Sequence, residues 1–476
     1  MTQQKPNILI IVTDQLRSDC VSCYHGYPVK TPNLDALSKE GMVFEQCYTP
    51  QPLCCPARQS IISSRRPEKN GGICNYDAAT RKGTRWLNPS SEFWPAQLKD
   101  MGYRNFYFGK WHVSPEHTPI DFGYEKYVSH NEYNAYRQKG YNPDNQNDRT
   151  KKDVGWLEWW MGKVDDVPLE YSATHWLSGM AEEQIEACAR EKGPWHIRLD
   201  FTEPHLPCQP CKEFYQLYEK DEIPEWIGFR ETFEDKPYIQ KQQLYNWGVE
   251  NMTWEDWREV VKRYYAVISQ IDDAVGRVIR KLKDTDQWEN TLIIFTADHG
   301  DMCGSHGMMD KHYIFYDDVV HIPFIAVWPG KISSGTRNDQ FIYQALDLGP
   351  TIMELTGGHI ENTDGRSLVP LLQGKTPSDW RQEVVSSYNG NQFGLYTQRM
   401  LRTREWKYIW NLTDVDELYD LTNDAGELHN LVHDPKCQDI LKEYRKRLQM
   451  IMEKEGDDLA TDPWLITVLL DEGRIL

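Results

Sequence analysis

The fold is decided by residues 7–13, Asn-Ile-Leu-Ile-Ile-Val-Thr, which are followed by Asp14. This run is apolar and β-branched throughout, which is typical of a strand buried on both faces of a mainly parallel sheet. Residues 291–297, Thr-Leu-Ile-Ile-Phe-Thr-Ala, repeat the pattern and end in Asp298 and His299. In open α/β sheets, ligands bind at the carboxyl ends of such strands. The sequence therefore predicts an α/β fold whose two strand ends hold a metal ion.

Helix signals lie between and beyond these strands. Thr31 and Pro32 precede a helical pattern over 33–40, and Gly41 closes it, so a capping hydroxyl, a first-turn proline and a terminal glycine mark one helix. A longer helix is predicted over 254–282, where apolar residues recur at helical spacing. We interpret that stripe as core.

From about Trp380 the pattern changes to short strands over 384–388, 394–402 and 406–410, followed by a helix near 437–453. Alternating short strands and one helix favour a small α+β unit. We therefore predict a catalytic domain over 1–375 and a C-terminal subdomain over 376–476, with a small antiparallel sheet and a helix.

The formal net charge of −19 argues against a nucleic-acid partner, because such proteins use basic patches to displace counterions. No apolar run approaches the roughly 20 residues that span a bilayer, so no membrane partner is expected. No export signal precedes the first strand, and we expect a cytoplasmic protein.

The chain has 11 cysteines, an odd number that favours reduced thiols over a disulfide framework. Two CxxC pairs, Cys20 with Cys23 and Cys208 with Cys211, together have the ligands of a zinc site. They lack the surrounding knuckle pattern and lie far apart in the sequence. The alternative is four unlinked thiols.

One cysteine has a distinctive setting. Residues 54–58, Cys-Cys-Pro-Ala-Arg, place proline and arginine at fixed offsets from Cys54, whereas Cys55 lacks those offsets. The alternative is an inert, buried cysteine pair, since free cysteine is often a small core residue. Further residues follow in a characteristic order: Asp14, Lys110, His112, His205, Asp298 and Lys311.

This set resembles the type I sulfatases of the alkaline phosphatase superfamily over nearly the whole chain. The resemblance implies a large mixed, mostly parallel sheet flanked by helices, and hydrolysis of a sulfate monoester. It also implies a maturation enzyme that converts Cys54 to formylglycine, whose hydrate is the nucleophile. A protein that keeps the anion cradle without catalysis is the alternative from another class.

By the resemblance, the metal ligands are Asp14, Gln15, Asp298, His299 and the modified Cys54, and the ion is calcium, with manganese or magnesium as alternatives. The commoner sulfatase pattern has a second aspartate where Gln15 stands. Gln15 with His299 resembles the phosphonate monoester hydrolases, so a phosphonate monoester or phosphodiester is the alternative substrate.

The same resemblance gives roles to the cations and histidines. Arg58 holds the hydrate oxygens, while Lys110 and Lys311 bind the sulfate from two sides. His112 takes a proton from the spare hydroxyl, and His205 donates one to the leaving alcohol. Together with a divalent ion these groups make the pocket attractive to anions although the protein as a whole is acidic.

The substrate-facing residues are less clearly marked. Asn75 resembles a substrate-binding amide, and Arg65 either supports the nucleophile loop or is a surface cation. Aromatic residues in segment 130–176 either stack a sugar or aryl group or pack the insertion onto the core; they are Tyr133, Tyr136, Trp156, Trp159, Trp160 and Trp176. We expect a small sulfated saccharide as substrate.

Overall fold

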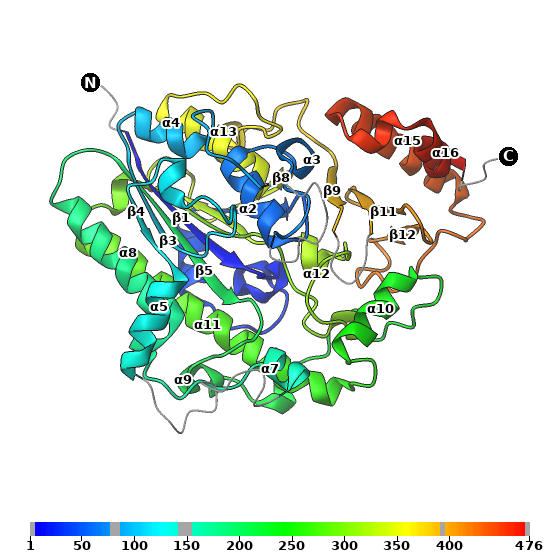
Figure 1. Ribbon diagram of the computed structural model, residues 1–476, viewed down its shortest axis with the longest axis horizontal. Coiled ribbons are helices and arrows are strands. Elements are labelled where there is room, and N and C mark those ends of the chain that lie inside the picture. The colour runs from blue at the N-terminus through cyan, green and yellow to red at the C-terminus, as the bar shows by residue number, and fades with distance from the viewer. Residues whose placement is uncertain (1–4, 77–85, 141–154, 391–395, 472–476) are drawn as a thin grey trace.

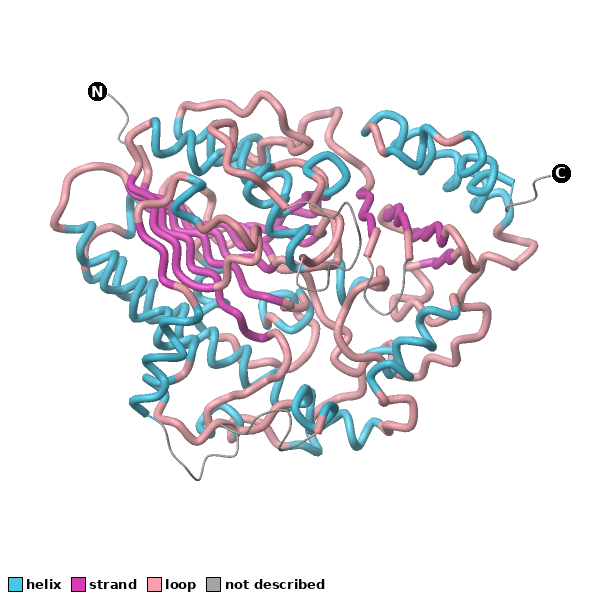
Figure 2. Tube along the Cα trace, viewed as in Figure 1, coloured by secondary structure: helices cyan, strands magenta, loops and turns pink. Residues whose placement is uncertain are grey.

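The protein is described by a computed structural model that covers residues 5–76, 86–140, 155–390 and 396–471. Within these ranges the strands form a large sheet and a small one, and helices pack around them (Figures 1 and 2).

The large sheet has the described strands in the order β4-β3-β5-β1-β6-β7-β2-β8. Its central strand β1 (Asn7–Asp14) runs parallel to both β5 (Trp195–Pro204) and β6 (Thr291–Ala297). Only β7 is antiparallel to its two neighbours among the pairs described. The other strands are β2 (Met42–Tyr48), β3 (Arg104–Gly109), β4 (Lys126–Val128), β7 (Phe324–Val327) and β8 (Thr336–Tyr343). The predicted mixed, mostly parallel sheet is confirmed.

Helices cover both faces of this sheet (Figure 1). One face carries α1 (Pro32–Lys39), α8 (Ala173–Ala189) and α11 (Trp254–Asp284), and the other carries α2 (Cys54–Ser63), α4 (Trp94–Asp100) and α13 (Gln344–Thr356). The predicted helices over 33–40 and 254–282 are therefore confirmed as α1 and α11. The apolar stripe of α11 is buried, as its spacing predicted.

The register of β1 and β6 determines where the site lies. Every residue of β1 is buried, and Thr13 pairs with Ala297. The backbone N–H of Asp298 donates to the carbonyl of Thr13 at 3.2 Å. The two acidic residues that follow these strands therefore emerge side by side at one edge of the sheet.

The small sheet has the order β12-β11-β10-β9 and is antiparallel. Its elements are β9 (Val384–Tyr388), β10 (Gln398–Arg402), β11 (Trp406–Asn411) and β12 (Glu417–Asp420), and α15 (Gln438–Glu455) and α16 (Pro463–Asp471) pack beside it. This confirms the predicted α+β unit, although β10 begins later than predicted and residues 394 and 395 lie outside the described ranges. The domain boundary at 375 stays a prediction.

The small sheet also contacts the loop that follows β6, through Lys407 of β11. The buried Lys407 ammonium donates to the carbonyl of Phe315 at 2.8 Å and pairs with Asp317 at 2.7 Å and Glu427 at 2.6 Å. Lys311 lies in the same loop, so the C-terminal subdomain supports a predicted site residue.

Shorter helices complete the described chain: α3 (Pro67–Asn70), α5 (His130–Arg137), α7 (Trp156–Met161), α9 (Lys212–Tyr215), α10 (Tyr238–Trp247), α12 (Asp317–Val320) and α14 (Val369–Leu372). No helix in the described ranges is long and apolar enough to span a membrane. All 11 cysteines are buried and carry free thiols. Among the described residues, the side-chain group able to hold a metal includes neither CxxC pair, so the zinc alternative has no support.

Candidate active site

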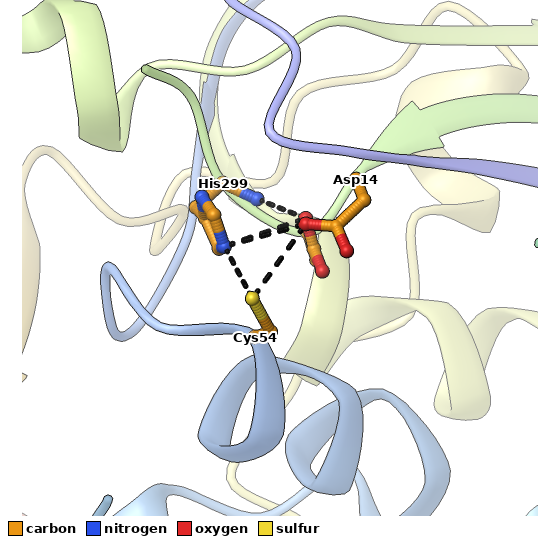
Figure 3. A group of neighbouring side chains, drawn as sticks. Asp14, Cys54 and His299 are labelled. Carbon is orange, nitrogen blue, oxygen red and sulfur yellow. Dashed lines mark hydrogen bonds and ion pairs between the residues drawn. The ribbon is translucent and has the colours of Figure 1, made fainter. Parts of the chain in front are cut away.

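Cys54 is the first residue of α2 and is buried at the strand ends. Its Sγ lies 3.1 Å from Nε2 of His299 and 3.6 Å from Oδ1 of Asp14. Figure 3 shows the thiol pointing from the helix start toward both side chains. The sulfur therefore lies beside two of the predicted metal ligands.

Local hydrogen bonds orient the side chains of His299 and Asp298 around Cys54. His299 Nδ1 donates to the carbonyl of Gly300 at 2.9 Å, which directs Nε2 at Cys54. Asp298 Oδ1 accepts the backbone N–H groups of Gln15 at 3.1 Å and His299 at 2.9 Å. The carboxylate is therefore fixed by the turns that follow β1 and β6.

These residues fit a divalent cation. Four buried residues each offer one ligand atom, and these atoms lie within 4.8 Å of one another. The residues are Asp14, Cys54, Asp298 and His299. Two carboxylates so close together in a buried site repel each other unless a cation lies between or beside them. Carboxylate oxygens suit hard ions, and the imidazole also admits a softer ion such as manganese.

Gln15 has a left-handed backbone, with φ of 70°, and a fully engaged amide. Its Nε2 donates to Asp301 at 2.8 Å and to Asp310 at 3.0 Å. Its Oε1 accepts a hydrogen bond of 2.6 Å from Lys311. The amide thus orients a predicted sulfate-binding lysine, and its role as a metal ligand stays a prediction.

Arg58 lies fully buried among carboxylates. Its guanidinium donates to Asp298 at 2.8 Å, to Asp200 at 2.7 Å and to the carbonyl of Lys110 at 2.9 Å. Its Nη2 lies 3.8 Å from Asp14 and has no hydrogen-bond acceptor among the described residues. Burial opposes the charge of Arg58, but Asp298 and Asp14 outweigh burial and raise its pKa. Arg58 therefore organises the carboxylates that are predicted to bind the metal, and its contact with the hydrate stays a prediction.

Lys110 follows a glycine that cannot be replaced without a clash. Gly109 has φ of 108°, and a Cβ there would lie 1.9 Å from the carbonyl oxygen of Asp200. This close approach of β3 to β5 lets the backbone N–H of Lys110 donate to the same carbonyl at 2.9 Å. The Lys110 ammonium then contacts the carboxylate of Asp14.

His205 and Lys311 meet on another side of the site. His205 Nδ1 lies 2.5 Å from the carbonyl of Leu206, so it carries the proton and donates. Nε2 is then the acceptor and lies 2.8 Å from the Lys311 ammonium. Burial alone would lower the pKa of Lys311, but Asp310 and Cys54 outweigh it and raise that pKa.

The electrostatics favour an anion at Cys54. Burial alone would raise the pKa of the thiol, but Lys110 and Lys311 outweigh burial and hold the pKa well below its usual range. His299 and His112 act in the same direction. An oxyanion at this position would receive the same stabilisation.

A cavity of about 830 Å³ connects most of the predicted residues. They come from separate parts of the chain and line it together: Cys54, Asn75, Lys110, His112, His205 and Lys311. The side-chain oxygen of Asn75 also accepts the backbone N–H of Cys55 at 3.1 Å, which ties the start of α2 to the cavity wall. Arg65 instead pairs with Glu92 at 2.6 Å on the surface, which corresponds to the surface-cation alternative.

Sequence reasoning did not identify Asp200, Asp310 or Trp247. Asp200 lies inside β5, where polar and apolar residues alternate, so it lacks the strand-end signal that marks Asp14 and Asp298. Asp310 adjoins Lys311 but has no motif of its own. Trp247 lines the cavity from α10, and no local pattern connects that helix to the site.

Comparison with known proteins decides the family. A profile of the sulfatase family matches residues 6–358, and one described as the C-terminal part of N-sulphoglucosamine sulphohydrolase matches residues 304–454. The chain belongs to the sulfatase family. This sulfatase is therefore a sulfuric ester hydrolase.

Two curated relatives match almost the whole chain. A choline-sulfatase of Rhizobium meliloti is 30% identical over 92% of this sulfatase and 84% of its own length. An N-acetylglucosamine-6-O-sulfatase of Bacteroides thetaiotaomicron is 25% identical over 97% of this chain and 88% of its own. Both matches therefore extend over most of this chain and most of the relative.

Among solved structures, the phosphonate monoester hydrolase of Agrobacterium radiobacter superposes with a TM-score of 0.80. It is 23% identical and the match covers 95% of this sulfatase and 96% of the other chain. At that identity the likeness shows the fold alone, and it confirms the predicted alkaline-phosphatase-like architecture.

Proposed function

We propose that this sulfatase hydrolyses the sulfate monoester of a small saccharide, with a formylglycine derived from Cys54 and a bound divalent metal. The observation that carries the proposal is the position of Cys54, which faces Asp14 and His299 at the floor of a cavity that Lys110 and Lys311 also line. The saccharide follows from the relative that acts on N-acetylglucosamine 6-O-sulfate.

Two groups would supply chemistry that the unmodified side chains lack. The hydrate of the aldehyde at position 54 would supply the nucleophilic oxygen, and its formation requires a maturation enzyme. A divalent ion, calcium by resemblance, would supply positive charge beside that oxygen. Asp14, Asp298 and His299 would hold the ion, with position 54 and Gln15 completing the predicted set.

The remaining residues bind the sulfate and move protons. Lys110 and Lys311 neutralise the sulfate oxygens, which otherwise repel a nucleophile. Arg58 orients Asp298 through their hydrogen bond of 2.8 Å. His112 lines the cavity and lowers the pKa of the Cys54 thiol, which supports a role in taking a proton at position 54.

His205 is the proposed proton donor to the leaving alcohol. Its Nδ1 is held by the Leu206 carbonyl, which leaves Nε2 as the atom that faces Lys311 and the cavity. In this structure Nε2 accepts a hydrogen bond from Lys311. His205 therefore acts as the donor only after Nε2 gains a proton, which it then passes to the alcohol that departs from the sulfate.

Replacing His205 with glutamine is expected to slow the hydrolysis of a sugar sulfate by about 10²- to 10⁴-fold, because a poor leaving alcohol needs the proton. The hydrolysis of an activated aryl sulfate should slow far less, because its leaving group departs without a proton. Comparing kcat/KM for the two esters tests this, and His359→Gln, at an exposed histidine that does not line the cavity, is the matched control. Equal slowing of both esters would contradict the role of proton donor.

Removing the metal is expected to abolish turnover. Chelation with EDTA followed by dialysis should remove the positive charge that the ion would supply beside position 54, and added calcium should restore hydrolysis more fully than manganese or magnesium. Initial rates with each metal measure this. Undiminished activity in thoroughly chelated, metal-free protein would refute the metal assignment.

A phosphonate monoester or phosphodiester hydrolase is the second candidate function. Gln15 and His299 favour it, and the phosphonate monoester hydrolase shares the fold. Parallel assays with an aryl sulfate, an aryl phosphonate and an aryl phosphodiester separate the candidates. We expect the highest kcat/KM for the sulfate, and a higher value for either phosphorus ester would reverse the assignment.

A further inference from the structure

The aromatic residues predicted in segment 130–176 divide into two groups. Tyr133 and Tyr136 of α5 pack against Trp176 of α8, with ring centroids 5.6 and 5.9 Å apart. This group is core. Trp156 and Trp160 of α7 instead line the active-site cavity.

A third indole joins them from a distant part of the chain. Trp247, the last residue of α10, lies 5.9 Å from Trp156 in a stacked pair and 6.0 Å from Trp160 in an edge-on pair. Trp156 and Trp160 are themselves 5.7 Å apart at 72°. We call Trp156, Trp160 and Trp247 the tryptophan corner.

The tryptophan corner exposes apolar surface inside a cavity. Trp156 is 52% exposed although it packs against two other indoles. Apolar surface costs free energy when it stays in water, at about 25 cal/mol per Å². Such a surface in a concave site is typical of a ligand-binding position.

The rest of the cavity indicates what that ligand is. Polar side chains also line it: Ser114, Glu116, His117, Thr118 and His130. A ligand that fits has an anionic end, an apolar face and several hydroxyl groups. A sulfated pyranose ring has all three, because its C–H bonds form a face and its hydroxyls project from the edge.

We propose that the tryptophan corner is the leaving-alcohol subsite and that it binds the C–H face of a pyranose ring whose hydroxyls reach the polar side chains of the same cavity. The inference rests on the proposed function and specifies its substrate recognition. An aryl group would leave those polar side chains unpaired. A trimethylammonium head also suits indole faces, so choline sulfate is the competing ligand in the test.

Binding without turnover tests the proposal. Cys54→Ala protein is titrated by calorimetry with monosaccharide sulfates that carry the ester on different hydroxyls. The tightest of them should bind about tenfold more weakly when Trp156→Ala is added, because one stacking face is lost. Trp156→Phe should retain most of the affinity. Trp159→Ala is the matched control, since Trp159 lies on α7 but does not line the cavity.

Three results would overturn the subsite. Choline sulfate or a phenyl sulfate could bind more tightly than every sugar sulfate, Trp156→Ala and Trp159→Ala could weaken binding equally, or inorganic sulfate could lose the same affinity as the sugar sulfate in Trp156→Ala. The last result would indicate a general disturbance of the site. Because the titration needs no turnover, a failed catalytic proposal leaves this measurement interpretable.

Discussion

Replacing Cys54 with alanine is expected to abolish sulfate ester hydrolysis, with a loss of at least about 10⁴-fold in kcat. The side chain is the precursor of the proposed nucleophile, and its Sγ lies 3.1 Å from His299 in the middle of the predicted metal ligands. No other cysteine has proline and arginine at the same offsets. Steady-state rates with a sugar sulfate measure the loss, and circular dichroism should show that the fold is retained.

The matched control is Cys55→Ala. Cys55 is fully buried beside Cys54, and burial raises the pKa of its thiol, so it is a neutral core residue. Its replacement should leave kcat within a fewfold of the original value. The mass of the tryptic peptide over residues 40–58 should also report an aldehyde in place of one thiol. The peptide contains Cys47, Cys54 and Cys55, and an active protein whose peptide retains all three thiols would contradict the mechanism.

The positions of the strand ends could be predicted because they follow from burial. Residues 7–13 and 291–297 have no polar alternation, which indicates two covered faces, and parallel neighbours end at the same edge. Asp14 and Asp298 were therefore predicted to meet. The antiparallel insertion of β7 was not predicted, because strand order depends on long-range pairing that no local pattern encodes.

The partners of individual side chains could not be predicted in the same way. No sequence signal indicated that Arg58 donates to Asp200, a residue 142 positions away. None indicated that the amide of Gln15 donates to Asp301 and Asp310. The predicted roles of Arg58 at the nucleophile and Gln15 at the metal stay predictions. A motif specifies which residues are present, whereas the direction of a long polar side chain depends on acceptors supplied by other strands.

Family resemblance and geometry contribute different parts of the functional assignment. The resemblance named the histidines and lysines, and the cavity brings His112, His205 and Lys311 together with Cys54. The sequence predicted two residues of the tryptophan corner, Trp156 and Trp160. It did not predict the third, Trp247, which comes from α10. Substrate recognition therefore depends on contacts between segments that have no shared motif.

Arg58→Met is expected to destabilise the protein by about 3–5 kcal/mol, because it removes a buried cation that pairs with Asp298 and Asp200 and lies 3.8 Å from Asp14. The methionine fills similar space, so the cost arises from carboxylates left without a partner. Asp298 should be affected most, since Asp200 retains its contacts with Arg198 and Tyr107. Urea denaturation measures the change in the free energy of unfolding.

Calcium should offset part of this loss, since an ion bound by Asp14 and Asp298 replaces some of the missing positive charge and stabilises the folded state that binds it. The destabilisation is therefore expected to be larger in EDTA than in calcium. Arg65→Met provides the matched control, because its exposed pair with Glu92 should contribute no more than about 1 kcal/mol. Equal destabilisation by the two substitutions, independent of calcium, would mean that Arg58 does not hold the metal-binding carboxylates together.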